Sequence, residues 1–265
     1  MGYGAMQLAG PAVVGPPRDR AEAVAVLREA VNSGITHIDT SDAYGPHVTN
    51  EIVREALHPY PEGLHVVTKV GALRGPDGSW DRADTPEQLR TQVHDNLRRL
   101  GLEVLDAVNL RVMDGPGTPV AERVGTLADL QREGLVRHLG ISTADRVQVD
   151  EARSVAEIVC VQNLYNLAHR EDDGLVDALA ADGVAYVPYF PLGGFSPLQA
   201  SELSNVATRL GASEQQVALA WLLQRSPNVL VIPGTSSRTH LRENIAAAHL
   251  ELPPDDLTEL DAIGR

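Results

Sequence analysis

The feature that most constrains the fold is a regular alternation of short apolar segments with helical patterns along all 265 residues. The short segments are rich in β-branched residues, as buried parallel strands are. Between them, apolar residues recur at helical spacing. Eight such repeats predict an α/β protein built as a closed (β/α)8 TIM barrel, which takes about 250 residues. We therefore expect a single barrel domain over residues 1–265.

Segment boundaries follow from glycines, prolines and capping residues. An open doubly wound sheet would carry its glycine-rich turn after the first strand, whereas Gly2-Tyr3-Gly4 lies inside it, which favours the barrel. The expected strands are Gly2–Gln7, Ile35–Asp39, His65–Val70, Leu105–Val112, Val136–Ser142, Ile158–Gln162, Val184–Tyr189 and Val229–Pro233. The helices with the clearest signals are Arg20–Ser33, Pro86–Leu100, Pro119–Glu133, Asp172–Asp182 and Ser213–Arg225.

Composition excludes several classes of function. The net charge of −14 argues against nucleic acid and against anionic membrane surfaces. No segment approaches the roughly 18 consecutive apolar residues of a membrane span, and no secretory leader opens the chain. The one cysteine, Cys160, lies in an apolar run and is expected to be a buried, inert thiol in a cytoplasmic protein. The histidines form no close pairs of the kind that bind metals, so we expect no metal.

Lysine is nearly absent from this chain. Of the 22 basic residues, 21 are arginine, and the one lysine is Lys69, at the end of the expected third strand. Asp39 ends the second strand, and Tyr44 lies in the loop that follows it. Because the carboxyl ends of barrel strands meet at one rim, we expect these three side chains to converge.

That combination has a chemical use. A free phenol rarely releases its proton at neutral pH, but an adjacent ammonium stabilises the phenolate. A carboxylate beside the lysine keeps the ammonium charged and oriented. We therefore expect Tyr44 to act as a proton donor, supported by Lys69 and Asp39. The plainer alternative is a salt bridge at the rim beside an unrelated tyrosine.

The segment Asp39-Thr40-Ser41-Asp42-Ala43-Tyr44-Gly45, followed by Thr68-Lys69, resembles the aldo-keto reductase superfamily. The resemblance extends along nearly the whole chain, and the joint order and spacing of its pieces make it specific. The other similar segments are Gly4-Ala5-Met6, Leu139-Gly140-Ile141-Ser142, Val161-Gln162-Asn163, Tyr189-Phe190-Pro191-Leu192-Gly193 and Ile232-Pro233-Gly234-Thr235-Ser236-Ser237, the last running on to Glu243-Asn244.

The resemblance implies an enzyme that uses NADPH to reduce a small aldehyde or ketone to an alcohol by hydride transfer. It gives Asp39, Tyr44 and Lys69 three places in the catalytic tetrad. It places the nicotinamide carboxamide on Ser142 and Gln162, and the nicotinamide ring on Tyr189. The full set of cofactor residues implied is Gly4, Ala5, Met6, Asp39, Ser142, Gln162, Tyr189, Phe190, Pro191, Leu192, Thr235, Ser236, Ser237, Arg238, His240, Glu243 and Asn244.

The last part of that set matches the pocket for the 2′-phosphate and adenine. Hydroxyl groups and backbone amides at Thr235–Ser237, opening a short helix, suit a phosphate, and Arg238 adds a charged fork. His240 stands where many relatives carry arginine, and it is expected to assist. These features favour NADPH over NADH. A serine-rich loop with a solvated arginine is the plainer alternative.

The fourth tetrad position departs from the family, because Arg111 stands where relatives carry histidine. Arg111 could replace the histidine as a catalytic donor to the carbonyl oxygen, bind an anionic or phenolate group of the substrate, or pair with Asp114 or Asp39 in an impaired site. The last case leaves open a different class, an NADPH-binding regulatory or catalytically impaired barrel protein. The intact set of Asp39, Tyr44 and Lys69 argues against it.

Two further departures concern Thr143 and the start of the chain. Relatives usually carry a Ser-Asn pair here, and Thr143 follows Ser142 in place of the asparagine. Because threonine has no amide, we expect a weaker contact with the nicotinamide carboxamide. Met1 directly precedes the first expected strand, whereas relatives usually carry a β-hairpin before it; we therefore expect a barrel without that hairpin.

The substrate pocket is expected to suit a flat or aromatic aldehyde. Several segments, among them Val108-Asn109-Leu110-Arg111, resemble a bacterial group that includes pyridoxal reductases, which implies pyridoxal as a substrate. For the assembly we expect a monomer or a weak homo-oligomer. The residues expected around the substrate are Met6, Tyr44, Trp80, Asn109, Met113 and Phe195.

Overall fold

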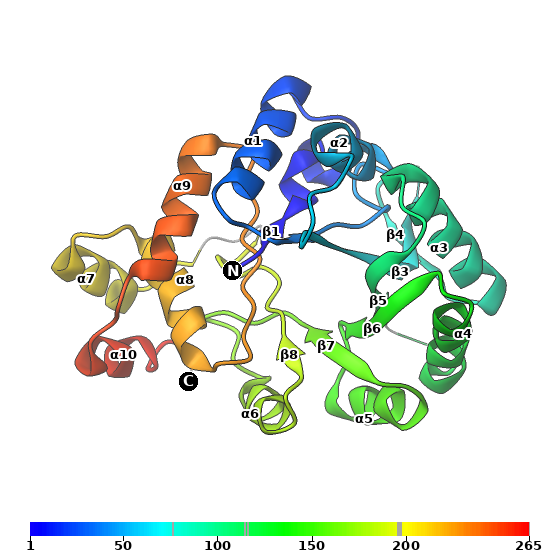
Figure 1. Ribbon diagram of the computed structural model, residues 1–265. Coiled ribbons are helices and arrows are strands. Elements are labelled where there is room, and N and C mark those ends of the chain that lie inside the picture. Colours follow the sequence, from blue (N-terminus) through cyan, green and yellow to red (C-terminus); the bar gives the residue numbers. More distant parts are fainter. Residues whose placement is uncertain (76, 114, 116, 195–197, 265) are drawn as a thin grey trace.

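Short buried strands form the centre of the molecule, and helices surround them (Figure 1). The computed structural model describes residues 1–75, 77–113, 115, 117–194 and 198–264. The parallel strands follow one another in the order β1-β2-β3-β5-β6-β7-β8, as a (β/α)8 barrel requires. Their bounds are β1 Tyr3–Gly4, β2 His37–Asp39, β3 His65–Arg74, β5 Leu105–Arg111, β6 Val136–Ser142, β7 Ile158–Gln162 and β8 Ala185–Tyr186.

The sheet closes through the segment 229–233, which sequence patterning predicted as the eighth strand. The Leu230 amide donates to the Tyr186 carbonyl at 2.9 Å, and the Gly2 amide donates to the Val231 carbonyl at 2.8 Å. Regular pairing is limited to a bridge between Tyr186 and Val229. Pro233 has no amide to donate, which helps to explain why this edge stays irregular.

The first strand is shorter than expected, because the chain turns into a 3₁₀ helix at Ala5–Leu8. Gly4 allows the strand to approach the closing segment: a Cβ atom there would lie 2.5 Å from the Ile232 carbonyl oxygen. Gly234 has the same role from the other side, where a Cβ atom would lie 2.5 Å from the Gly4 carbonyl oxygen. Two glycines thus permit the contact that closes the barrel.

Helices pack against the outside of the strands. The helix α3 begins with a capping box at Thr85 and Gln88 and ends at Gly101, which has a left-handed conformation with φ of 70°. The bounds are α1 Arg20–Asn32, α2 Val48–Leu57, α3 Pro86–Leu100, α4 Val120–Arg132, α5 Arg146–Val155, α6 Asp173–Ala181, α7 Ser201–Leu210, α8 Glu214–Arg225, α9 Arg238–Ala246 and α10 Pro254–Leu260, with further 3₁₀ turns at Pro11–Val13 and Ala247–His249.

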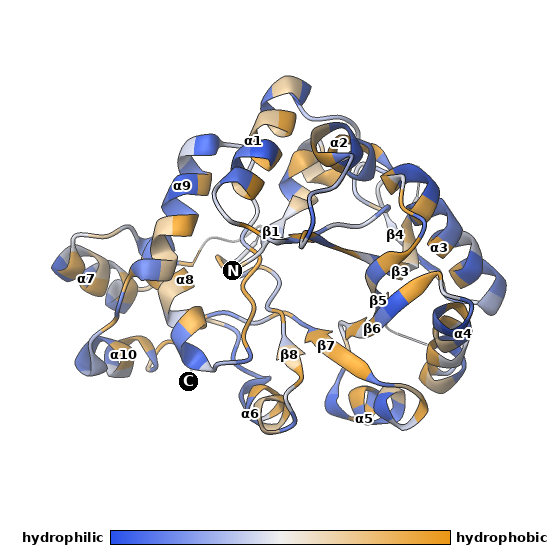
Figure 2. Cartoon of the chain, in the orientation of Figure 1, coloured by the Kyte–Doolittle hydropathy of each residue, from blue (hydrophilic) through white to orange (hydrophobic). Residues whose placement is uncertain are grey.

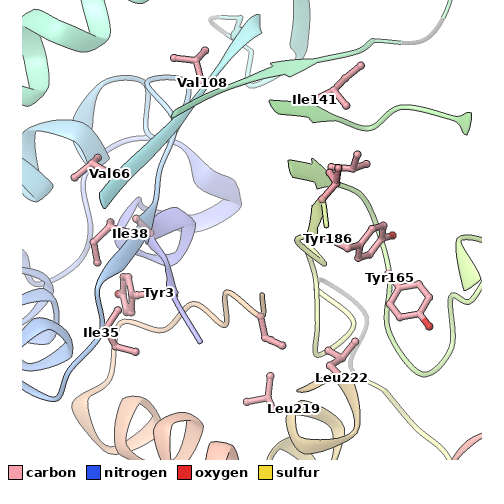
Figure 3. Packing of buried hydrophobic residues seen from close by; sticks show 14 of the residues in the cluster. Tyr3, Ile35, Ile38, Val66, Val108, Ile141, Tyr165, Tyr186, Leu219 and Leu222 are labelled. Carbon is pink, nitrogen blue, oxygen red and sulfur yellow. The ribbon is translucent and has the colours of Figure 1, made fainter. Parts of the chain in front are cut away.

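One large cluster of buried apolar side chains joins strands and helices. Ile38, Val66 and Val108 enter it from β2, β3 and β5 (Figure 3), and helices α1 to α9 contribute residues such as Leu27 and Leu219. Figure 2 shows apolar residues along β7 and mixed surfaces on the surrounding helices. Among the described residues, no helix is both long and apolar enough to cross a membrane.

An antiparallel hairpin extends β3 beyond the barrel rim. The strand β4, Trp80–Ala83, pairs with the last residues of β3, with Arg74 opposite Trp80. Sequence patterning did not predict β4, because Trp80-Asp81-Arg82-Ala83 is short and largely polar. The hairpin brings Trp80 to the edge of the barrel mouth.

Candidate active site

A cavity of about 500 Å³ opens at the carboxyl ends of the strands. Most of the residues that sequence analysis assigned to catalysis, to the nicotinamide or to the substrate line this cavity. These are Gly4, Met6, Asp39, Tyr44, Lys69, Trp80, Arg111, Met113, Gln162, Tyr189, Phe190, Pro191 and Leu192.

Asp39, Tyr44 and Lys69 meet at the base of the cavity. The Lys69 ammonium donates to Asp39 Oδ1 at 2.6 Å and to the Thr40 carbonyl at 3.0 Å. Lys69 Nζ also lies 5.3 Å from the centre of the Tyr44 ring. Both charged side chains are almost fully buried, with exposed fractions of 3% and 4%. A fixed cation beside the phenol stabilises its deprotonated form, which is what a proton donor needs.

The second oxygen of Asp39 accepts from Gln162 Nε2 at 2.8 Å. This bond fixes the orientation of the Gln162 amide and turns its oxygen, Oε1, away from the carboxylate. Gln162 Oε1 is buried and has no hydrogen-bond partner among the described residues. A buried acceptor without a donor is costly, so this atom suits a ligand that brings an N–H group, as a nicotinamide carboxamide does.

The loop that carries Tyr44 rests on a buried polar network. The Thr40 hydroxyl donates to Asn50 Oδ1 at 2.8 Å, and Asn50 Nδ2 donates to Asn96 Oδ1 at 2.9 Å. The Thr68 hydroxyl donates to the same Asn96 oxygen at 2.6 Å. Asn50 and Asn96, from α2 and α3, are fully buried. The network joins the ends of β2 and β3 to two helices, and it thereby fixes the loop between Asp39 and Tyr44.

Asp42, in the same loop, anchors it from the outer side. Its carboxylate contacts His47 at 3.0 Å and pairs with Arg99 of α3. Burial raises the pKa of Asp42, and the neighbouring His47 and Arg99 oppose that rise. The loop is therefore held by charge as well as by neutral hydrogen bonds.

Arg111, the residue at the departing tetrad position, lies against the indole of Trp80. Its guanidinium carbon is 4.4 Å from the ring centre, and that of Arg74 is 4.5 Å from it. Arg111 does not pair with Asp39, whose two oxygens accept from Lys69 and Gln162. Asp114 lies outside the described residues.

One expected pocket residue, Asn109, lies deeper in the barrel than the cavity. Asn109 is not part of the lining, contrary to prediction: it is fully buried, and its oxygen accepts from the Cys160 thiol at 3.2 Å. Asn109 lies two residues below Arg111 on the same strand face, deeper in the barrel, where Gly140 leaves room for its side chain. Phe195 lies outside the described residues. Cys160 is buried and forms no disulfide, and burial raises the pKa of its thiol to about 12.

The segment expected to hold the adenosine end begins helix α9. The Ser237 hydroxyl caps the helix by accepting from the His240 amide at 3.4 Å, and the Thr235 hydroxyl accepts from the Ser237 amide at 3.0 Å. Arg238 is exposed and pairs with Glu22 of α1 at 3.0 Å. The helices α1 and α9 lie side by side (Figure 1). The segment thus presents hydroxyl groups and a cation at a helix start, as a phosphate site requires.

The remaining expected cofactor residues are more scattered. Ser236 lines a smaller hollow beside the α1 start, and His240 is exposed. Asn244 is buried, and the Glu243 carbonyl accepts from the Gln216 side chain at 3.4 Å. Ala5 and Ser142 are buried and adjoin lining residues in the chain without lining the cavity themselves.

Further residues line the cavity, among them Thr143, which sequence analysis linked to the nicotinamide carboxamide. Thr143 lines the cavity directly, with a positive φ of 58°, beside the expected Ser142. The end of the closing segment also lines the cavity. It directly precedes Thr235, which was expected to bind the cofactor, and this position was a sequence signal for its place in the lining. Ile232, Pro233 and Gly234 belong to the segment that resembles the family's cofactor segment but were not named as site residues, and the lining residues that no sequence signal indicated are Gln7, Val112 and Gly194.

Comparisons with known proteins agree with this geometry. Residues 1–265 match the aldo/keto reductase family. The chain is 63% identical to pyridoxine 4-dehydrogenase of Escherichia coli over 270 residues, which covers 100% of this chain and 94% of that protein. It is 37% identical to an uncharacterized oxidoreductase of Schizosaccharomyces pombe, covering 100% of this chain and 86% of that protein.

Solved structures are similar throughout. A thermostable aldo-keto reductase in complex with the inhibitor epalrestat has a TM-score of 0.86 and 31% identity, covering 98% of this chain and 93% of that one. An aldo-keto reductase from Klebsiella pneumoniae in complex with NADPH has a TM-score of 0.82 and 27% identity, covering 98% and 89%. The expected barrel fold and the family resemblance are therefore confirmed, and the chain belongs to the aldo/keto reductase family.

Proposed function

We propose that this enzyme reduces pyridoxal to pyridoxine, with NADPH as the donor. The observation that carries the proposal is the buried contact of Lys69 with Asp39 at 2.6 Å, with the same ammonium 5.3 Å from the Tyr44 ring. The 63% identity to a pyridoxine 4-dehydrogenase supports the substrate. The cavity is apolar, has aromatic walls and has a volume of about 500 Å³, so it has room for a flat aromatic substrate.

The protein's own residues supply the proton chemistry. Bound NADPH provides a hydride for the carbonyl carbon. As the carbon–oxygen double bond becomes a single bond, Tyr44 gives its hydroxyl proton to the carbonyl oxygen, and the product alcohol forms. Lys69 stabilises the phenolate left on Tyr44 until solvent returns a proton, and Asp39 holds Lys69 in place.

The residues that would hold the cofactor fit its two ends. Gln162 Oε1, buried and without a partner among the described residues, suits the carboxamide N–H group. Tyr189, half-buried in the cavity wall, offers a flat face to the nicotinamide. At the other end, Ser237 and Arg238 at the α9 start suit the 2′-phosphate, with Arg238 exchanging Glu22 for the phosphate.

The test is direct. Purified protein is incubated with NADPH and pyridoxal, and pyridoxine is quantified by chromatography. The proposal predicts pyridoxine in amounts equal to the NADPH consumed. Tight NADPH binding without product from pyridoxal would contradict the proposal. If a panel of aromatic aldehydes, ketones and quinones also gave no product, a cofactor-binding regulatory protein would be favoured instead.

We further propose a cytoplasmic enzyme that acts as a monomer or a weak homo-oligomer, without nucleic acid or membrane partners. The free, buried Cys160 and the net charge of −14 support this setting. Light scattering after size-exclusion chromatography measures the oligomeric state, and a stable tetramer would contradict the proposal.

A further inference from the structure

Arg111 brings to the cavity a positive charge that the protein does not neutralise. Within the described part of the chain, its guanidinium takes part in no ion pair or hydrogen bond, and the residue is partly buried. Arg123, by comparison, is buried against Asp84 at 3.1 Å. A cation removed from water without a counter-charge is unfavourable, so the position suits an anion carried by a ligand.

The position of that charge is defined by Trp80. The Arg111 guanidinium carbon lies 4.4 Å from the centre of the Trp80 ring, so the indole holds the cation at this point of the cavity wall. The guanidinium N–H groups donate in the plane of the group, and none of them has a hydrogen-bond partner among the described residues. Trp80 itself is held at the end of the β3–β4 hairpin, where Arg74 contacts the same ring at 4.5 Å.

The cavity's carboxylate cannot serve as the missing partner. Asp39 is the acidic residue among the described lining, and its two oxygens accept from Lys69 and Gln162 at 2.6 and 2.8 Å. Among the described residues, the cavity therefore holds one cation with a counter-charge, Lys69, and one without, Arg111.

The two cations lie at different heights on neighbouring strands. Asn109 is paired in register with Lys69, and Arg111 follows two residues later on the same face of β5, roughly 6–7 Å nearer the mouth. A carbonyl group that reaches Tyr44 beside Lys69 thus has Arg111 to one side of it. The group on the neighbouring carbon of a flat substrate is the one that can face Arg111.

We propose that Arg111 selects aromatic aldehydes that carry an ionised hydroxyl group on the ring carbon next to the aldehyde-bearing carbon, by donating to that phenolate oxygen. The inference rests on the proposed function and deepens it, since pyridoxal has this arrangement. A phosphate group is less suited to the position, because it calls for several donors, and the nearby Arg74 is bonded to the Ala12 carbonyl at 2.5 Å.

The experiment separates recognition of the phenolate from action on the carbonyl. Initial rates are measured with NADPH for benzaldehyde, 2-hydroxybenzaldehyde and 3-hydroxybenzaldehyde, and for pyridoxal and its 5′-phosphate, across a pH range that ionises the phenols. The enzymes compared are the wild type, Arg111→Met and Arg111→Lys. Arg146→Met, which loses an exposed charge paired with Asp150 on α5, is the matched control.

For Arg111→Met, the proposal predicts that kcat/KM for ionised 2-hydroxybenzaldehyde and for pyridoxal falls roughly 10- to 100-fold, the range for a lost hydrogen bond to a charged group. The kcat/KM values of Arg111→Met for benzaldehyde and 3-hydroxybenzaldehyde stay within about threefold of the wild-type values. Arg111→Lys recovers part of the loss, and Arg146→Met changes nothing. The dissociation constant of pyridoxine, measured by calorimetry with NADPH present so that no hydride transfer occurs, rises in parallel in Arg111→Met.

Other outcomes overturn the inference. Equal losses for all aldehydes would assign Arg111 to the carbonyl oxygen, in place of the family's histidine. A loss specific to pyridoxal 5′-phosphate would mean that Arg111 binds phosphate, and no loss would give it no part in recognition. If the wild type reduces none of these aldehydes, the proposed function itself fails, and the recognition of its substrate fails with it.

Discussion

At the scale of single residues, the chain gives one buried lysine a defined task. Sequence analysis identified Lys69 because it is the one lysine among 22 basic residues, and the structure places its ammonium 2.6 Å from Asp39. The role of Asn109 could not be predicted in the same way. Strand alternation correctly gave its direction, but not its depth in the barrel, which depends on the space left by Gly140.

Thr143 is a residue under conformational strain at the cavity wall. Its φ of 58° lies in the left-handed region, which is unfavourable for a β-branched residue and better tolerated by asparagine or glycine. We expect Thr143→Gly and Thr143→Asn both to relieve strain of roughly 1 kcal/mol, with glycine's gain partly offset by its greater unfolded-state entropy. Urea unfolding measures this effect.

The same pair of variants tests cofactor orientation. Thr143→Asn supplies an amide that Thr143→Gly lacks, so we expect tighter NADPH binding in the asparagine variant alone. Fluorescence titration gives both dissociation constants. Equal affinities in the two variants would show that the side chain at this position does not contact the cofactor.

At the scale of elements, sequence patterns located the regular segments and missed the irregular ones. The predicted bounds of α3, β6 and β7 agree with the structure, because capping residues and apolar runs define them. The helices α2, α5 and α7 were not singled out, and β4 was missed because its stability comes from pairing with β3 and its sequence is polar. The closing segment at 229–233 was predicted as a strand, but it pairs through isolated bonds and not through a regular ladder.

The buried network between α2, α3 and the strand ends predicts a coupled loss of stability and rate. Asn96→Leu would leave the donors of Asn50 and Thr68 without their acceptor, at a cost of about 2–4 kcal/mol in the free energy of unfolding. Because this network supports the Tyr44 loop, kcat should fall as well. His94→Leu, exposed on the same helix, is the control and should change neither quantity. Unchanged stability in Asn96→Leu would contradict the network's role.

At the scale of the whole molecule, the alternation of strands and helices was sufficient to predict the barrel, since few other folds accommodate that pattern. Substrate choice was harder to predict, because it depends on how the β3–β4 hairpin and the loops meet over the cavity. Trp80 illustrates the limit: its presence in the pocket was expected, but its contact with Arg111 arises from a strand pairing that the sequence did not reveal.

Cys160 reports on the opening of the whole barrel. It is the one cysteine of the chain, it is buried, and burial raises its pKa to about 12. We expect iodoacetamide at pH 8 to label the native protein at least roughly a thousandfold more slowly than the urea-unfolded chain, because labelling requires opening of the barrel. Mass spectrometry over time measures both rates. Rapid labelling of the native protein would contradict the closed barrel around β7.

The role of Tyr44 is tested by the rate of the Tyr44→Phe variant with pyridoxal and saturating NADPH, together with the NADPH dissociation constant of the variant. The phenylalanine ring keeps the shape of the site and removes the proton. The account predicts that kcat falls by about 10²- to 10⁴-fold while NADPH affinity stays within about twofold. Turnover equal to that of the wild type would contradict the central claim that Tyr44, supported by Lys69 and Asp39, donates the proton.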